Sequence, residues 1–281
     1  MAPTFESKFA AVGDLNLHYL DWGERTNERV LVCLHGTSGS ARHFDRLANI
    51  LAPSYRVIAL DQRGHGESDK PPRGYDAVTL AGDLAGFADQ IGIGRFALLG
   101  ASLGSRVATV YTGGHPERVA RLILVDVSFE MPEEAQQRMI HGHLTRRRTF
   151  TSFEDALSYS QSMPQRSRWT PEMHREEIEH AIVKRPDGLW EWRYSLEAAL
   201  QSLQQARQDL WNYVAKIQCP TLLIRGQESD VLTVSTAEKF LRLVKNCRSV
   251  EIEGAGHGVP RDNPERFNQV VCEFLKREFA T

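Results

Sequence analysis

Five short runs of almost continuous Val, Leu and Ile are the feature that most restricts the fold of this chain. They lie at residues 29–36, 55–64, 95–102, 121–128 and 220–226, and each is bounded by Gly, Asp or Pro. A strand with one face in water alternates apolar and polar side chains, whereas a strand covered on both faces is apolar throughout. These runs therefore predict strands of a parallel sheet that is covered on both faces.

Helix-like segments separate the predicted strands. They occupy residues 40–51, 77–92 and 103–119, the last with a break expected at Gly113-Gly114. Strands that alternate with helices predict an α/β sheet with right-handed crossover connections. Two earlier segments, SKFAAV and NLHYLDWG, alternate more strictly and predict an antiparallel start to the sheet.

The pattern changes after Ser128. Up to about Ile217 the chain is helix-like, charged and rich in Arg, Glu and Trp, and we expect no strand there. Another apolar run at 220–226 then predicts a strand. We expect a helix at STAEKFLRLVKN after it, then a short strand at SVEIEG and a final helix at NPERFNQVVCEFLKREF. We therefore predict an α/β core domain formed by residues 1–128 and 218–281, with residues 129–217 as a helical insertion.

Composition and charge narrow the functions that are expected. The chain has 281 residues, 41% hydrophobic and 25% charged, and its net charge of -2 predicts no general affinity for nucleic acid or for an anionic membrane. The four cysteines lie far apart without a C-x-x-C motif, as expected of reduced thiols in a cytoplasmic protein. We expect neither a secretory signal at the start nor a membrane span elsewhere.

A serine between two glycines ends the third apolar run. Residues 100–104, GASLG, have the form G-x-S-x-G, in which a sharp turn from strand to helix exposes the hydroxyl of Ser102. A serine nucleophile needs a base, and His257 in GAGHGVP lies on a glycine-rich loop after the last predicted strand. It also needs donors for an oxyanion, and the backbone N–H groups of Thr37 and Leu103 are the candidates.

Four motifs, in this order, resemble those of the α/β-hydrolase family, and the resemblance extends over essentially the whole chain. LHGTSGS resembles the family's oxyanion loop, DQRGHGESDKP its strand-four loop, GASLG its nucleophile elbow and GAGHGVP its histidine loop. The resemblance implies an eight-stranded, mostly parallel sheet, a helical cap inserted after strand six, and a catalytic order of Ser, acid and His. It also implies that the residues of DQRGHGES brace a loop near the floor of the active site instead of binding a metal.

The catalytic acid is the point at which this chain departs from the commonest family pattern. Family members usually carry Asp three residues after the glycine that ends strand seven, but Ser229 stands at that distance from Gly226, and Asp230 comes one place later. A shift of one residue turns a side chain away. The family's other acid position is the end of strand six, where this chain has Asp126. We favour Asp126 as the acid that orients His257, with Asp230 as the alternative.

These residues predict a hydrolase that cleaves a small carboxylic ester, thioester, lactone or amide through an acyl-enzyme, with no metal or organic cofactor. Ser102 argues against the dehalogenase and epoxide-hydrolase branches of the family, which have Asp at this position. Three alternatives stay open: hydrolysis of a C–C bond, lyase or cofactor-free oxygenase chemistry with His257 as base, and a receptor that binds its ligand on the same fold.

The predicted insertion should decide the substrate. It carries several arginines among aromatic side chains, namely Arg146, Arg147, Arg148, Arg166, Arg168 and Arg193. Either they form a solvated helix face, or one or two point inward and bind a carboxylate, in which case the small-molecule substrate is anionic. The histidines of this segment, His141, His143, His174 and His180, are expected at the surface. The oligomeric state stays open between a monomer and a homodimer.

Overall fold

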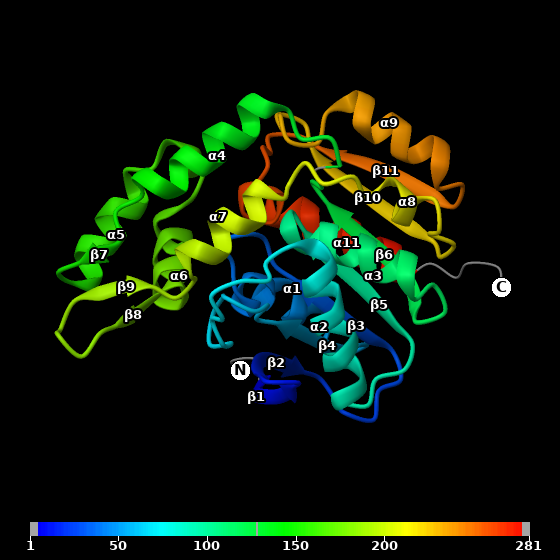
Figure 1. Ribbon diagram of the computed structural model, residues 1–281, viewed down its shortest axis with the longest axis horizontal. Helices are drawn as coiled ribbons and strands as arrows, with labels where there is room; N and C mark the ends of the chain where they lie inside the picture. Colours follow the sequence, from blue (N-terminus) through cyan, green and yellow to red (C-terminus); the bar gives the residue numbers. More distant parts are fainter. Residues whose placement is uncertain (1–4, 128, 277–281) are drawn as a thin grey trace.

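The computed structural model describes residues 5–127 and 129–276, and it confirms the predicted mostly parallel sheet (Figure 1). Eight strands lie in the order β1-β2-β4-β3-β5-β6-β10-β11. Phe5–Val12 (β1) and Leu15–Trp22 (β2) run antiparallel to each other, and β2 is also antiparallel to β4. The other strands pair in parallel: Val30–Leu34 (β3), Arg56–Leu60 (β4), Phe96–Ala101 (β5), Val119–Val125 (β6), Thr221–Gly226 (β10) and Cys247–Ile252 (β11).

Helices cover both faces of the sheet, which explains why its central strands are apolar throughout. Every residue of β3, β4 and β10 is buried. One face packs against Ala77–Gln90 (α2), Leu103–Gly114 (α3), Trp211–Val214 (α8) and Val234–Leu243 (α9). The other face packs against Asp45–Leu51 (α1) and Pro264–Lys276 (α11).

Two helical segments differ in detail from the predicted ones. The segment predicted over 40–51 begins as a 3₁₀ turn, Ala41–Phe44, before α1 continues it. A short helix that the sequence did not predict, Val259–Asp262 (α10), follows the histidine loop. The helix after Ser102 ends at Gly114, at its expected break.

Between β6 and β10 the chain leaves the sheet and forms a layer of its own, drawn in green and yellow in Figure 1. We call residues 133–204 the cap. Its elements are Glu133–Thr145 (α4), Thr149–Phe150 (β7), Phe153–Gln161 (α5), a 3₁₀ turn at Pro164–Arg166, Pro171–Ala181 (α6), Ile182–Lys184 (β8), Trp190–Trp192 (β9) and Leu196–Gln204 (α7).

The expectation that no strand interrupts this segment was wrong. Strands β7, β9 and β8 form a three-stranded antiparallel sheet. Each is only two or three residues long, too short for an alternation of apolar and polar residues to mark it in the sequence. Packing stabilises the sheet instead, because Phe150 is buried with Ile178 and Ile182 and lies edge-on to Trp192 at 5.3 Å.

The limits of the insertion, residues 129 and 217, stay a prediction, and Ser128 lies outside the described residues. Helix α8, just before residue 217, packs on α3 of the core. A Cβ on Gly113 would lie 2.6 Å from the carbonyl oxygen of Tyr213, so glycine permits this close approach. Within residues 5–127 and 129–276, no helix has both the length and the apolar character needed to span a membrane.

Candidate active site

The turn between β5 and α3 holds Ser102 in a backbone conformation that few residues adopt. Its φ is 53° and its ψ is -113°, a combination that costs a non-glycine residue on the order of 1–3 kcal/mol. The flanking glycines make the sharp turn possible: a Cβ on Gly100 would lie 2.2 Å from the carbonyl oxygen of Gly104, and a Cβ on Gly104 would lie 2.2 Å from that of Leu34. Backbone packing therefore requires both glycines of the motif, and the turn leaves Ser102 at the carboxyl end of its strand.

His257 reaches Ser102 from the loop that follows β11. Gly226 gives this loop room to pass, because a Cβ there would lie 2.0 Å from the carbonyl oxygen of Gly256. The Nε2 atom of His257 lies 2.9 Å from Ser102 Oγ, and its Nδ1 atom lies 2.9 Å from Asp126 Oδ1. The side chain of His257 is 25% exposed, so part of the ring is open to solvent.

Asp126 is the candidate acid that the structure brings to His257. It follows β6, is fully buried, and has a positive φ of 47°. Besides the contact with His257, its carboxylate accepts a hydrogen bond from the Gly226 N–H at 2.9 Å and another from the Ser229 hydroxyl at 2.6 Å. These partners offset the cost of burying the carboxylate.

The alternative acid, Asp230, does not contact His257. Its side chain is 59% exposed, and its carboxylate pairs with Arg138 of α4. The preceding residue, Ser229, is buried and donates to Asp126. The motifs do not mark Ser229 as a site residue, although its place at the usual acid position is the signal that could have found it.

Thr37 and Leu103, the predicted oxyanion donors, lie on the two segments that adjoin Ser102. Leu103 is the first residue of α3, where backbone N–H groups have no partner within the helix. Gly36 packs against the serine, since a Cβ on Gly36 would lie 3.2 Å from Ser102 Cβ, and Thr37 follows it directly. The structure thus brings the segments of both residues to Ser102, and the role of Thr37 and Leu103 as donors stays a prediction.

Two buried histidines hold the loop that carries Thr37. The Nε2 atom of His35 accepts a hydrogen bond from the Gln62 N–H at 3.1 Å, so its Nδ1 carries the proton and donates to the Gly36 carbonyl at 2.8 Å. His65 Nε2 lies 2.6 Å from the Thr37 carbonyl oxygen. Burial, together with nearby His65, lowers the pKa of His35 to about 3, and burial also lowers the pKa of His65. The His35 ring is therefore neutral at pH 7.

Asp61 of the DQRGHGES motif connects its own loop to strand β2 and to the start of the 3₁₀ turn Ala41–Phe44. Its carboxylate accepts hydrogen bonds from the Ala41 N–H at 2.6 Å and the Glu67 N–H at 3.0 Å, and it lies 2.7 Å from His18 Nδ1. Burial alone would raise the pKa of Asp61, but the hydrogen bond with His18 and these amides outweigh it and lower the pKa to about 2. Among the described residues, no group of three or more His, Cys, Asp or Glu side chains is arranged to hold a metal ion.

A family model described as alpha/beta hydrolase fold matches residues 29–264. The chain belongs to the α/β-hydrolase family. A 3-hydroxybutyrate-oligomer hydrolase of Cupriavidus necator is 30% identical to it over 85% of this chain and 86% of the relative. A 2-hydroxy-6-oxononadienedioate/2-hydroxy-6-oxononatrienedioate hydrolase of Burkholderia vietnamiensis is 30% identical over 94% of this chain and 92% of the relative. The crystal structure of E-2-(acetamidomethylene)succinate hydrolase matches with a TM-score of 0.90 and 25% identity over 98% of this chain and 100% of that one.

The cap arginines of this α/β-hydrolase have different surroundings. Arg147 and Arg168 are exposed and pair with Asp155 and Glu228, as expected of a solvated face. Arg166, in contrast, is buried, with its Nη1 atom donating to the Ser160 hydroxyl at 2.7 Å.

Arg146 is a cap arginine with no carboxylate partner among the residues that the structure describes. It is half-buried, its Nη1 donates to the Tyr194 hydroxyl at 3.2 Å, and its Nε is buried without a hydrogen-bond partner in the described part of the chain. Tyr194 stacks on His65 with their ring centres 6.4 Å apart, and His65 in turn contacts Thr37. A cation with unused hydrogen-bonding capacity therefore lies two side chains from the predicted oxyanion site.

The expectation that the cap histidines lie at the surface was wrong for His143 and His174, which are 7% and 5% exposed. The Nδ1 atom of His174 lies 2.9 Å from the Ser160 hydroxyl. Burial, with a further contribution from Arg146, lowers the pKa of His143 to about 4. The cap has a hydrophobic cluster of its own, formed by Phe150, Ala156, Ile178 and Ile182, and the sequence does not show which helix faces this cluster covers.

Proposed function

We propose that this chain is a serine hydrolase that cleaves a small carboxylic ester, thioester, lactone or amide through an acyl-enzyme on Ser102. The observation that supports this most is the unbroken chain of hydrogen bonds from Ser102 through His257 to Asp126, with distances of 2.9 Å at both steps. Such a chain activates a serine hydroxyl, because a buried carboxylate orients the imidazole and stabilises the imidazolium that forms.

In the first half of the reaction, His257 Nε2 takes the proton of Ser102 as Oγ adds to the substrate carbonyl carbon. The N–H groups of Thr37 and Leu103 would stabilise the oxyanion, and the imidazolium then protonates the leaving group as its bond to carbon breaks. In the second half, His257 takes a proton from water as the water oxygen adds to the acyl carbon. That proton returns to Ser102 Oγ as the carboxylic acid is released.

Turnover of a short-chain p-nitrophenyl ester by the wild type beside Ser102→Ala tests this proposal. We expect steady release of p-nitrophenolate by the wild type and a loss of at least about a thousandfold in the variant. A wild type without turnover, or a variant that keeps the wild-type rate, would contradict the proposal.

The substrate we propose carries a carboxylate. Arg146 supports this, since a half-buried guanidinium with no acidic partner in the described part of the chain is suited to bind one. Two of the similar proteins are also named for dicarboxylate substrates, 2-(acetamidomethylene)succinate in one and a hydroxy-oxo-dienedioate in the other.

Arg146→Gln tests the carboxylate. It should raise KM for the p-nitrophenyl monoester of succinate about tenfold while leaving KM for p-nitrophenyl butyrate unchanged. Arg147→Gln is the matched control, because Arg147 is exposed and paired with Asp155. Equal effects of Arg146→Gln on the two esters would contradict the carboxylate site.

Hydrolysis of a C–C bond by the same residues is a second candidate, favoured by the similarity to the hydroxy-oxo-dienedioate hydrolase. Turnover of such a dienedioate without turnover of p-nitrophenyl esters would select it. An acyl adduct on Ser102, trapped by acid quench and read by peptide mass spectrometry, would exclude the lyase, oxygenase and receptor alternatives, since none of them forms one.

A further inference from the structure

One buried carboxylate of the cap contacts a residue next to the histidine loop and another next to the oxyanion loop. Glu177 lies on α6 and is 4% exposed. Its carboxylate lies 2.6 Å from Arg261 Nη2 and 3.2 Å from His43 Nε2, both in the core, and 3.5 Å from Arg166 Nη2 in the cap. The proposed mechanism gives Glu177 no role, so the arrangement requires another explanation.

Arg261 connects Glu177 to the histidine loop. It belongs to α10, directly after that loop, and its N–H donates to the Gly258 carbonyl at 2.8 Å. The next residue, Asp262, accepts a hydrogen bond from the Gly256 N–H at 2.9 Å. Because Gly256 and Gly258 flank His257, α10 holds the proposed base on both sides.

A second contact joins the cap to the same helix. Trp169, just before α6, directs its indole N–H to Asp262 Oδ1 at 3.4 Å. The centre of its ring also lies 4.6 Å from the guanidinium carbon of Arg166 and 5.6 Å from that of Arg261. Both partners that the cap contributes here, Trp169 and Glu177, thus meet residues that support the histidine loop.

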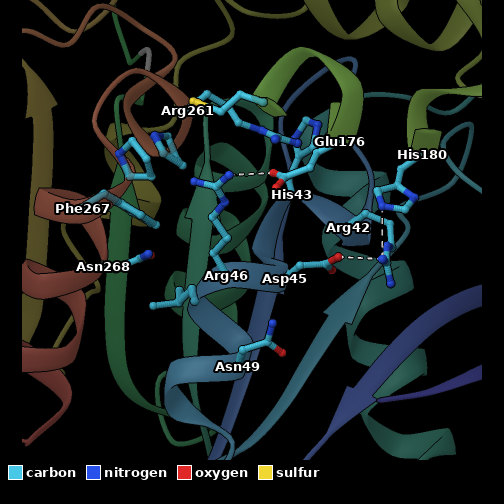
Figure 2. Close-up of a pocket in the computed structure, with 14 residues that line it drawn as sticks. Arg42, His43, Asp45, Arg46, Asn49, Glu176, His180, Arg261, Phe267 and Asn268 are labelled. Carbon is cyan, nitrogen blue, oxygen red and sulfur yellow. Dashed lines mark hydrogen bonds and ion pairs between the residues drawn. The ribbon is translucent and has the colours of Figure 1, made fainter. Parts of the chain in front are cut away.

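His43 connects Glu177 to the oxyanion loop. It lies in the 3₁₀ turn after that loop, and its N–H donates to the Ser40 carbonyl at 3.0 Å. Its ring packs against Gly39, where a Cβ would lie 2.7 Å from Nδ1. Figure 2 shows His43 and Arg261 at this junction of the core with α6, beside Glu176.

We propose that Glu177 is a positioning residue that makes docking of the cap a condition for a complete active site, an inference that rests on the proposed function. With the cap docked, one carboxylate holds the guanidinium beside the histidine loop and the imidazole beside the oxyanion loop. When the cap separates from the core, both loops lose this support at once. Substrate enclosed under the cap is then processed by an aligned His257 and Thr37.

The charge of Glu177 suits this role. Burial alone would raise its pKa, but Arg261, His43 and Arg166 outweigh burial and hold the pKa well below the usual value for glutamate. The carboxylate is therefore ionised at neutral pH. Removing the charge of Glu177 while the cap stays docked would leave the guanidinium and imidazole groups that face it without a compensating charge, so it should loosen this junction between cap and core.

Glu177→Gln tests the inference, with Glu176→Gln as the matched control. Glu176 precedes it on α6 and also joins cap to core, through Arg46 at 2.8 Å, but it is 46% exposed and reaches neither loop. Glu177→Gln should lower kcat on p-nitrophenyl butyrate by about 10- to 100-fold and change KM by less than about threefold, because misplaced groups slow the chemical step. Glu176→Gln should stay within about twofold of the wild type. Glu177→Asp, which keeps the charge, should recover part of the loss.

Hydrogen exchange read by mass spectrometry gives a measure that does not depend on turnover. Peptides covering residues 35–44 and 254–262 should exchange faster in Glu177→Gln and at the wild-type rate in Glu176→Gln. Unchanged exchange in these two segments, or a loss of kcat that both variants share in proportion to their fall in Tm, would overturn the inference. Failure of the proposed function would show separately, as turnover that survives in Ser102→Ala, and the exchange rates would still decide the role of Glu177.

Discussion

Asp126→Asn should lower kcat by about three to four orders of magnitude, as loss of the orienting carboxylate does in other serine hydrolases. In the wild type, Oδ1 accepts from His257 Nδ1 and from the Ser229 hydroxyl, while Oδ2 accepts from the Gly226 N–H. An amide group has one accepting oxygen and one donating nitrogen. Whichever way the substituted side chain lies, its nitrogen faces a donor.

The size of the effect follows from the two possible orientations. With the amide nitrogen toward His257, the ring must present a lone pair at Nδ1, so its proton moves to Nε2 and the ring can no longer accept the proton of Ser102. With the nitrogen toward Gly226, a buried N–H loses its acceptor, which costs about 1–3 kcal/mol of stability. In both cases the negative charge that stabilises the imidazolium is gone.

Asp230→Asn is the control, because that carboxylate is exposed and its surface pair with Arg138 is worth about 0–1 kcal/mol. Steady-state kinetics on a p-nitrophenyl ester, with circular dichroism to verify folding, should show the control within about twofold of the wild type. A loss of less than about tenfold in Asp126→Asn, or an equal loss in Asp230→Asn, would refute the reasoning.

Three further predictions concern the surroundings of the site. Ser229→Ala removes a hydrogen bond to the Asp126 carboxylate and should lower kcat roughly tenfold with little change in KM, whereas an unchanged kcat would mean that this hydroxyl does not support the acid. Gly104→Ala should lower Tm by several degrees or prevent folding, since its Cβ would lie 2.2 Å from the Leu34 carbonyl oxygen. Gly114→Ala is the control and should leave Tm nearly unchanged, because its Cβ would meet nothing within 4 Å. Similar Tm values for the two variants would contradict the steric argument. The pKa of His143 is lowered from 6.5 to about 4, so between these pH values the unfolded chain binds a proton that the folded chain does not. The free energy of unfolding should therefore fall as the pH drops from 6.5 toward 4. Urea unfolding should show a smaller fall in His143→Gln than in the wild type.

Much of the core could be predicted from the sequence. The apolar runs mark strands that helices cover on both faces, and β3, β4 and β10 are buried along their whole length. The cap was less predictable, since its strands are too short to show a period and its helices pack partly on one another. Its interior histidines and the three-stranded sheet were missed for that reason.

The candidate site, too, could be predicted from the sequence only in part. Ser102 and His257 stand in glycine-rich motifs whose backbone requirements are local, so the sequence alone indicated both residues. The sequence could not show whether Asp126 or Asp230 contacts His257. That contact depends on how β6 and β10, about 100 residues apart, pair in the sheet. That pairing puts Ser229 and the Gly226 N–H on Asp126 and leaves Asp230 facing solvent.

Local spacing of apolar residues and glycines by itself determined the α/β core of this protein, the exposed serine and the histidine loop. Only the tertiary structure decided which carboxylate contacts His257, that the half-buried Arg146 has no acidic partner among the described residues, and that Glu177 touches both Arg261 and His43. The physical reason is that hydrophobic period and turn chemistry act over a few neighbouring residues. The direction of a single side chain at the end of a strand or in a cap is set by packing between segments that are distant in the chain.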